Sequence, residues 1–482
     1  MKQQTLTLAV ILGATILGSS CATPQPGSSF DRVAAETSDR TGVAIAWPMN
    51  AKARAAIEAQ VNALLSEPLD QESAVVVALL NNRALRAKFA QLGFAEADLV
   101  EAGLLENPSL TAAIGFPDRP PSMAQLDFGL TLNLLRVLLM PANKDIASVR
   151  LDAEVLRVAD VVVETAAMAQ IAFLDLQAST HMTALLREIA IAAEVAFEFA
   201  EQVHAAGNLS DLALANQMAL REMARLDYAH ALAESAALRE RLNVHLGVWG
   251  EHTGWTLVDR LPEIPASEAD LSQLESLAIR QRLDLVASAK EVEAISKALG
   301  MQQDWRYILT TDVGFNAEHD TDGQWVFGPE LSIELPIFNQ RQAEILRLDA
   351  ALLEAEARLE AMAIEVRSDV RRLRDRLYAI RYECEHYRDT IVPLRERITM
   401  LTQQQYNFML VDTFDLLAAK REETDAYRGY IESIHNYWTT RVELERVVGG
   451  RLPDAGEHLV PGGTNQPATT IPMAPDHSHG GN

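Results

Sequence analysis

Few side chains in this 482-residue chain are placed to do chemistry, and the nearest approach to a metal site lies at its C-terminal end. His477 and His479 lie two residues apart beside Asp476 and could hold a divalent metal ion weakly. A tail of this composition pre-organises no ligands, so an inert tail is the competing interpretation. No two of the four histidines on the first pair of predicted long helices share a helix face at i, i+4 spacing, and we interpret these four as packing or surface residues: His181, His204, His230 and His245.

No catalytic constellation is apparent in the sequence. It contains no HExxH motif and no phosphate-binding glycine loop, and its carboxylates fall on charged helix faces. Cys384 has only His386 nearby, two residues along a predicted helix and therefore on a different face, so we interpret Cys384 as a buried or shielded thiol. We expect a protein that is not an enzyme and that needs no cofactor.

The first twenty residues have the pattern of an export signal. Lys2 provides a positive start, and the apolar core from Leu6 to Leu17 is too short to span a membrane as a mature helix. Cys21 follows small residues and resembles the acylated cysteine of bacterial lipoproteins, although the usual leucine lies one position too early, at Leu17. Cleavage after Ala22 is the alternative, and both interpretations predict export.

The net charge of -25 narrows the possible partners. A nucleic-acid surface needs basic patches, so we expect no nucleic-acid partner. Two cysteines exclude a disulfide scaffold. Acidic side chains spread over helix faces and a water-filled interior would favour cations over anions.

The stretch from Trp325 to Asn407 contains the elements around which the chain is organised. From Trp325 to Leu335, apolar and polar residues alternate, which predicts a strand with one apolar face. From Asn339, a suitable helix cap, apolar residues recur at spacings of three and four as in a coiled coil with one stutter. Nearly seventy helical residues would form a rod about 100 Å long.

This stretch occurs twice. Arg150-Leu151-Asp152-Ala153 reappears as Arg347-Leu348-Asp349-Ala350, and Gly207 corresponds to Met409 at a slightly larger shift. A drifting shift indicates a duplication with small insertions. Each copy is predicted to contain a helix, two strands, a very long helix, a turn and a return helix, and the first long helix is expected from about Asn143 to Ala206.

The four predicted strands each have an apolar face and a small or polar face: 110–116, 126–134, 307–315 and 325–335, the second pair separated by a loop at 316–323. About ten residues with this alternation are typical of membrane β-barrels, whereas a hairpin packed on a soluble core is the alternative. Four strands cannot close a barrel around water, and lipid does not tolerate open edges. We therefore predict a homo-oligomer with cyclic symmetry.

The expected domain organisation follows these elements. A signal peptide (1–20) precedes an extended segment (21–70) with a short helix near 51–65. The first repeat (71–250), a connector (251–267) and the second repeat (268–449) follow. The last stretch, 450–482, is rich in Pro, Gly and Thr, which predicts a disordered tail.

Between Gln71 and Gly449 the chain resembles the TolC-like outer membrane efflux family. The resemblance rests on the duplicated order, on Leu335-Pro336-Ile337-Phe338 and on two turns, Gly207-x-x-Ser210 and Asp412-x-Phe414-Asp415-Leu416-Leu417. It implies a mainly α fold with a membrane β-barrel: a homotrimer with twelve strands, four per chain, continued by an α-helical barrel across the periplasm. It also implies a channel in the outer membrane lipid that passively exports drugs or metal ions, delivered by an inner-membrane transporter and a periplasmic adaptor.

In this family, the turns between long and return helices close the periplasmic end through polar and acidic side chains. By position Asp415 matches a gate aspartate, while Ala418 stands where the family has a second acidic residue and Met409 where it has glycine. The resemblance therefore implies a gate whose closing contacts differ from those usual in the family, with Asp412 and Asp211 as substitutes for the missing acidic residue. A plain helix N-cap is the alternative role for Asp412.

A periplasmic, lipid-anchored coiled-coil adaptor is the alternative function. An adaptor needs one helical hairpin and a compact β-rich body, whereas this sequence predicts two hairpins and two strand pairs. A coiled-coil spacer would leave the strand pairs unexplained.

Overall fold

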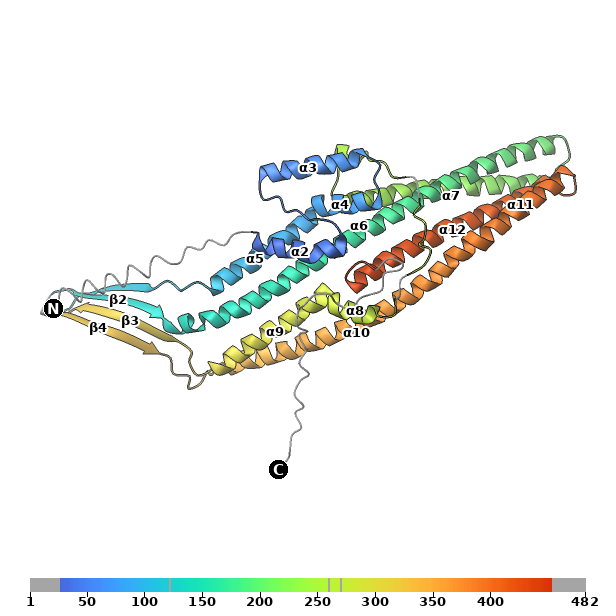
Figure 1. Ribbon diagram of the computed structural model, residues 1–482. Helices are drawn as coiled ribbons and strands as arrows, with labels where there is room; N and C mark the ends of the chain where they lie inside the picture. Colours follow the sequence, from blue (N-terminus) through green and yellow to red (C-terminus); the bar gives the residue numbers. More distant parts are fainter. Residues whose placement is uncertain (1–26, 121–122, 259–260, 269–270, 453–482) are drawn as a thin grey trace, which may run out of the picture.

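The computed structural model describes residues 27–120, 123–258, 261–268 and 271–452. The predicted export signal, Cys21 and the C-terminal histidines lie outside these residues. The molecule is elongated, with an antiparallel sheet at one end and the turns of two long helical hairpins at the other (Figure 1).

The same order of elements occurs twice along the chain. The first set is α4 (Gln71–Asn81), α5 (Arg83–Ala102), β1 (Ser109–Gly115), β2 (Gln125–Asn133), α6 (Leu134–Ala205) and α7 (Asp211–Leu246). The second set is α8 (Leu274–Gln281), α9 (Leu283–Asp304), β3 (Thr311–His319), β4 (Trp325–Ile333), α10 (Gln342–His386), the π-helical turn η2 (Tyr387–Ile391), α11 (Val392–Asn407) and α12 (Thr413–Val448). We call α6 with α7 the first hairpin, and α10 to α12 the second hairpin.

Both long helices begin elsewhere than predicted. α6 starts directly after β2 because the Asn133 side chain accepts a hydrogen bond from the Arg136 backbone N–H at 2.9 Å, and Pro141 is accommodated inside the helix. α10 starts at Gln342 rather than at Asn339, because Asn339 instead accepts a hydrogen bond from the Arg341 backbone N–H at 3.0 Å. Arg341 then enters the helix with a left-handed φ of 61°.

Two further expectations are wrong. The N-terminal segment was expected to be extended, yet it contains α2 (Ser28–Thr41) as well as α3 (Ala51–Ser66), which lies where a helix was predicted. The first half of the stretch expected to form the loop at 316–323 is strand: β3 continues to His319. A tight turn closed by a hydrogen bond from the Asp320 N–H to the Gln324 carbonyl then leads into β4. α2 packs on α5 and α6, contacts that the local sequence pattern does not reveal.

The four strands form one sheet in the order β1-β2-β3-β4, with every neighbouring pair antiparallel. The register places Leu110 opposite Leu130, and Leu130 opposite Phe315. Directly opposed residues in an antiparallel sheet share a face. One face of the whole sheet is therefore apolar and the other small or polar.

The hydrophobic core lies midway along the molecule, where the short helices pack against the long ones. In each repeat the first helix is broken, at Asn82 and at Arg282, and the end of the return helix fits against the break. Gly247 ends α7 with a φ of 67°, and a Cβ there would lie 2.7 Å from the Asn81 carbonyl oxygen. Asn81 Nδ2 donates to the Gly247 carbonyl at 2.9 Å, which fixes the joint.

Candidate functional site

The apolar face of the sheet is not covered by any of the residues that the structure describes. Leu110 is 75% exposed, Phe327 61% and Leu331 63%, and further large apolar side chains of the same face are also exposed: Ile114, Phe128, Leu130, Phe315, Trp325 and Ile333. A hairpin packed on a soluble core would bury these residues. That alternative is therefore wrong for this chain.

The opposite face of the sheet carries four carboxylates. Asp127 lies opposite Glu318, whose Oε1 accepts a hydrogen bond from Gln125 Nε2 at 2.5 Å. Asp312 and Glu330 lie on the same face by the register, and the four strands contain no lysine or arginine. This face would present a negative surface to any solute that passes along it.

The dimensions of the sheet fit a bilayer. β2, β3 and β4 have nine residues each, which span about 30 Å at 3.3 Å per residue, similar to the hydrocarbon core. Leu335, Ile337 and Phe338 continue the exposed apolar surface beyond β4. Among the described residues, no strand pairs with the outer edge of β1 or of β4, so both edges are open.

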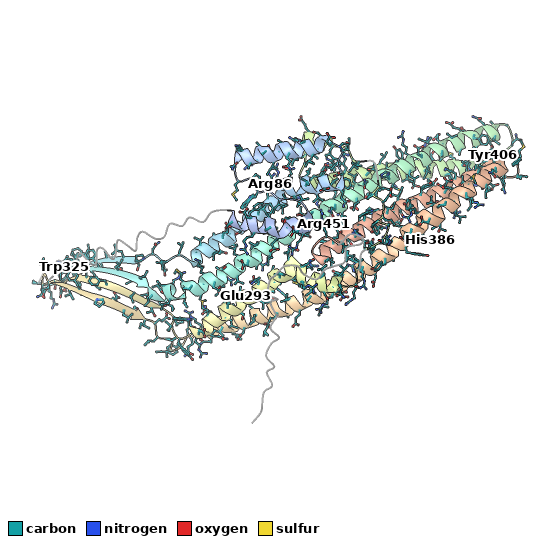
Figure 2. All side chains as sticks on the ribbon, viewed as in Figure 1. Arg86, Glu293, Trp325, His386, Tyr406 and Arg451 are labelled. Carbon is teal, nitrogen blue, oxygen red and sulfur yellow. The ribbon has the colours of Figure 1, made fainter. Side chains whose placement is uncertain are left out.

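The turns of the two hairpins lie at the opposite end of the molecule from the sheet. Figure 2 shows Trp325 at the sheet end and Tyr406 near the turn of the second hairpin. Gly207 in the first turn has a φ of 77°, and Met409 has the same left-handed conformation with a φ of 57° despite its side chain. Left-handed backbone is unusual outside glycine, so the second turn is locally strained.

Asp412 and Asp415 form a reciprocal cap at the start of α12. The Asp412 carboxylate accepts a hydrogen bond from the Asp415 backbone N–H at 2.9 Å, and Asp415 accepts one from the Asp412 N–H at 3.2 Å. The N-cap role of Asp412 is thereby confirmed. Both carboxylates are also held close together on the turn.

Asp211 lies on the turn of the first hairpin, beside His204. His204 Nδ1 donates to the Leu209 carbonyl at 2.9 Å, and its Nε2 lies 3.4 Å from an oxygen of Asp211, whose side chain is 98% exposed. The structure therefore brings Asp412 and Asp415 together and leaves Asp211 on the other hairpin. Asp211 follows the N-cap residue Ser210.

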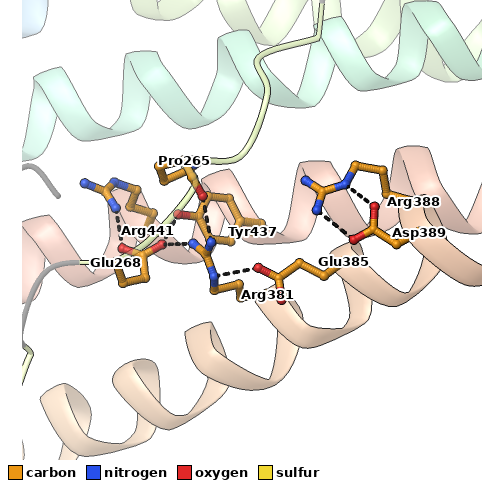
Figure 3. Close-up of polar contacts among 8 residues, drawn as sticks. All are labelled: Pro265, Glu268, Arg381, Glu385, Arg388, Asp389, Tyr437 and Arg441. Atoms are coloured by element: carbon orange, nitrogen blue, oxygen red, sulfur yellow. Dashed lines mark hydrogen bonds and ion pairs between the residues drawn. The ribbon is translucent and has the colours of Figure 1, made fainter.

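A buried ionic cluster was missed by the sequence analysis. Glu268, which precedes α8, forms ion pairs with Arg381 of α10 at 3.0 Å and with Arg441 of α12 at 2.7 Å, and it accepts a hydrogen bond from Tyr437 (Figure 3). Burial, together with the hydrogen bond to Glu268, raises the pKa of Tyr437. Glu268 is more than 100 residues away from each of its partners in the sequence. No local pattern in the sequence therefore indicates that these side chains meet. We call these four residues the Glu268 latch.

A partly buried carboxyl, Asp160, lies where the two repeats meet. Burial, and secondly the nearby Asp284 carboxylate, raises the pKa of Asp160 on α6 to about 6, while Arg282 and Arg446 oppose that shift. Burial also raises the pKa of the Cys384 thiol, which is fully buried as predicted. Neither group lies near a reacting constellation in the described chain.

Within residues 27–452, apart from the short undescribed gaps, no three His, Cys, Asp or Glu side chains are grouped to hold a metal ion. None of the helices in that range combines the length and the apolar character needed to cross a bilayer.

Comparison with known proteins gives a family match for part of the chain and several similar folds. Residues 274–450 match the family described as outer membrane efflux protein. The fold is similar to the CmeC outer membrane channel of Campylobacter jejuni, with a TM-score of 0.69, 15% identity and coverage of 79% of this chain and 86% of that one. It is also similar to the outer membrane protein VceC of Vibrio cholerae, with a TM-score of 0.66, 14% identity and coverage of 82% and 97%. The second repeat therefore matches the outer membrane efflux protein family, and the fold of the chain is that of these channel structures.

A membrane protein from Pseudomonas aeruginosa has a similar fold, with a TM-score of 0.68, 19% identity and coverage of 79% of this chain and 92% of that one. A comparison with curated proteins gives no match. The family match and the shared fold confirm the resemblance to outer membrane efflux proteins. Asp211, Asp412 and Asp415 lie on the hairpin turns, and their gating role stays a prediction.

Proposed function

We propose that this chain is the outer membrane channel of a tripartite efflux system and works as a homotrimer. The observation that carries the proposal is the sheet, with its uncovered apolar face and two open edges. In lipid, an open strand edge leaves backbone N–H and C=O groups without partners, each at a cost of several kcal/mol. The edges must therefore be paired by other copies of the sheet.

Three copies supply twelve strands, and closure requires β1 of one protomer to pair with β4 of the next. The apolar faces then contact lipid and the carboxylate-bearing faces line a water-filled pore. The long helices continue this pore: α6, with 72 residues, spans about 110 Å at 1.5 Å per residue. That length suits a passage across the periplasm.

The proposed partners lie at the hairpin turns. A periplasmic adaptor and an inner-membrane transporter would deliver substrate there, and the solute would leave through the sheet end. The acidic pore face favours cationic drugs or metal ions. CmeC is described as an outer membrane channel, which supports the channel class for this chain.

Membrane fractionation of cells that produce the full chain tests this proposal. We expect a heat-resistant trimer in the outer membrane that only detergent releases and that conducts ions in a planar bilayer. A protein extracted from the periplasm by salt alone, as a monomer without detergent, would instead support the adaptor alternative and refute the channel.

A further inference from the structure

Three arginines gather at one place on the side of this otherwise acidic molecule, whose net charge is -25. Arg54 near the start of α3 and Arg83 at the start of α5 are both exposed, and Arg86 lies one turn further along α5. Figure 2 shows Arg86 in the region between α3 and the start of α5. We call these three residues the Arg86 patch.

The positive charges of the patch are close together and are not neutralised by ion pairs. Burial lowers the pKa of Arg86, and the neighbouring charges of Arg83 and Arg54 lower it further, opposed by the Glu58 carboxylate. Arg86 Nη2 donates to the Leu80 carbonyl at 2.9 Å, whereas its Nε is buried without a hydrogen-bond partner. Among the residues that the structure describes, no carboxylate forms an ion pair with any of the three arginines.

The second repeat is an internal reference for the patch. When the breaks in the first helices of the two repeats are aligned, Leu283 and Val286 occupy the positions of Arg83 and Arg86. Between η1 (Gly250–Thr253) and α8, the described residues contain no helix that corresponds to α3. The repeat fold therefore forms without these charges, and the patch is specific to the first repeat.

The position of α3 leaves the patch accessible. Ile57, Val61 and Leu65 pack α3 against the core, and most of its other side chains are exposed, Arg54 among them. Arg83 lies in the first turn of α5, where the helix dipole adds positive potential. Guanidinium groups and a helix start thus make one open, positively charged surface.

The distance from the sheet excludes lipid headgroups as the occupant. α5 runs along the long axis of the molecule (Figure 1), and its last residue, Ala102, lies about 24 Å beyond Arg86 at 1.5 Å per residue. The sheet begins only at Ser109. Headgroups occupy about 5 to 8 Å on each side of the hydrocarbon core. With the sheet in the outer membrane, the patch lies in the periplasm, beyond the reach of lipid.

We propose that the Arg86 patch binds carboxylates of the cell-wall polymer, peptidoglycan, and so fastens the channel laterally to the cell wall. Guanidinium groups bind carboxylates through paired hydrogen bonds, and the peptide stems of this polymer present free carboxylates along its length. The acidic remainder of the chain repels an anionic polymer, so charge complementarity confines the contact to the patch. This inference rests on the proposed function, which places the patch in the periplasm.

Co-sedimentation of the purified full-length trimer in detergent with purified peptidoglycan sacculi tests the proposal. We expect the parent to sediment with sacculi at low salt, and the combined Arg54→Gln and Arg83→Gln variant to bind at least about fivefold less. Both side chains are exposed, and Arg86 is left in place because it bonds the Leu80 carbonyl. Lys88→Gln is the matched control, because Lys88 is exposed on a different face of α5 from Arg86.

Two further comparisons identify the chemistry and the occupant. The parent should not sediment with sacculi whose carboxylates have been blocked by amidation, and replacing Arg54 and Arg83 by lysine, which keeps the charge, should retain binding. Equal sedimentation of the parent and the double glutamine variant would refute the proposal. A double glutamine variant that is monomeric where the parent is trimeric would show that the patch contacts a second copy of the chain, which also overturns it.

Conductance in a planar bilayer separates this proposal from the channel itself. The parent and the double glutamine variant should conduct equally, because the patch lies on the side of the molecule and not in the proposed pore. A parent that never conducts refutes the proposed function, whereas a conducting parent that does not sediment with sacculi refutes the cell-wall contact alone.

Discussion

At the scale of single residues, the raised pKa of Asp160 makes the stability of the fold depend on pH. Its folded-state pKa of about 6 lies above its ordinary value of 3.8, so the fold favours the protonated form. The native state then binds more protons than the unfolded state between these values, and stability falls as pH rises from about 4 to 6. A buried carboxylate near Asp284 is the physical source of that loss.

Replacing Asp160 by asparagine should therefore stabilise the protein at pH 7.5, by on the order of 1 to 3 kcal/mol, because the amide carries no charge to desolvate. The gain should shrink as pH falls towards 4.5. Thermal unfolding in detergent at both pH values measures it, with Asp349→Asn on an exposed helix face as the control. An Asp160→Asn variant that is less stable at pH 7.5 would contradict the prediction.

The carboxylates of Asp412 and Asp415, which lie close together on the turn of the second hairpin, allow a second prediction for single residues. Replacing both by alanine should raise single-channel conductance by about twofold or more if their charges constrict the pore. The double alanine variant also loses the reciprocal cap, at a cost of about 1 kcal/mol. Asp412→Asn separates the two effects, because asparagine caps a helix equally well but carries no charge. Unchanged conductance in all variants would count against the gate assignment.

At the scale of elements, the two faces of β4 should respond differently to charge. Leu331 and Ser332 are adjacent and both exposed in the single chain, but they lie on the apolar and polar faces. Leu331→Arg should destabilise the membrane-inserted protein by about 2 kcal/mol, whereas Ser332→Arg, facing water, should cost little.

The yield of detergent-extracted trimer and its urea midpoint measure this difference between the variants. Equal behaviour of the two would show that neither face meets lipid. Leu331 and Ser332 are adjacent in β4, so an arginine at either position should affect expression and strand propensity to a similar degree. A difference between the two variants therefore reports on the environment of each face.

The sequence was informative about elements where a local pattern determined them. Alternation along the strands predicted the two faces of the sheet, because a period of two is a property of the strand itself. The helix starts were missed because Asn133 and Asn339 cap or turn according to neighbours that periodicity does not encode. The coiled-coil spacing was visible in the sequence, whereas the packing of Tyr387 on Gly429 joins two helices of the second hairpin and could not be predicted from either helix alone.

At the scale of the whole molecule, the predicted duplication accounts for the order of elements from α4 to α12. The Glu268 latch and the packing of α2 were not predicted, because both depend on contacts between segments that are distant in sequence. The gate residues were placed by resemblance, and the structure adds the reciprocal hydrogen bonds of Asp412 and Asp415 and the contact of Asp211 with His204.

The helix α2 has a consequence for how the molecule is made. Arg40 donates to the Gly449 carbonyl at 3.2 Å, and Arg451 donates to the Thr41 carbonyl at 2.8 Å, so the first described helix is bonded to residues just after the end of α12. A protein chain is synthesised from its N-terminus, and these bonds cannot form until more than 400 residues have followed. The N-terminal helices therefore remain incompletely packed, and prone to aggregation, until the C-terminal end of α12 and the residues after it have been made.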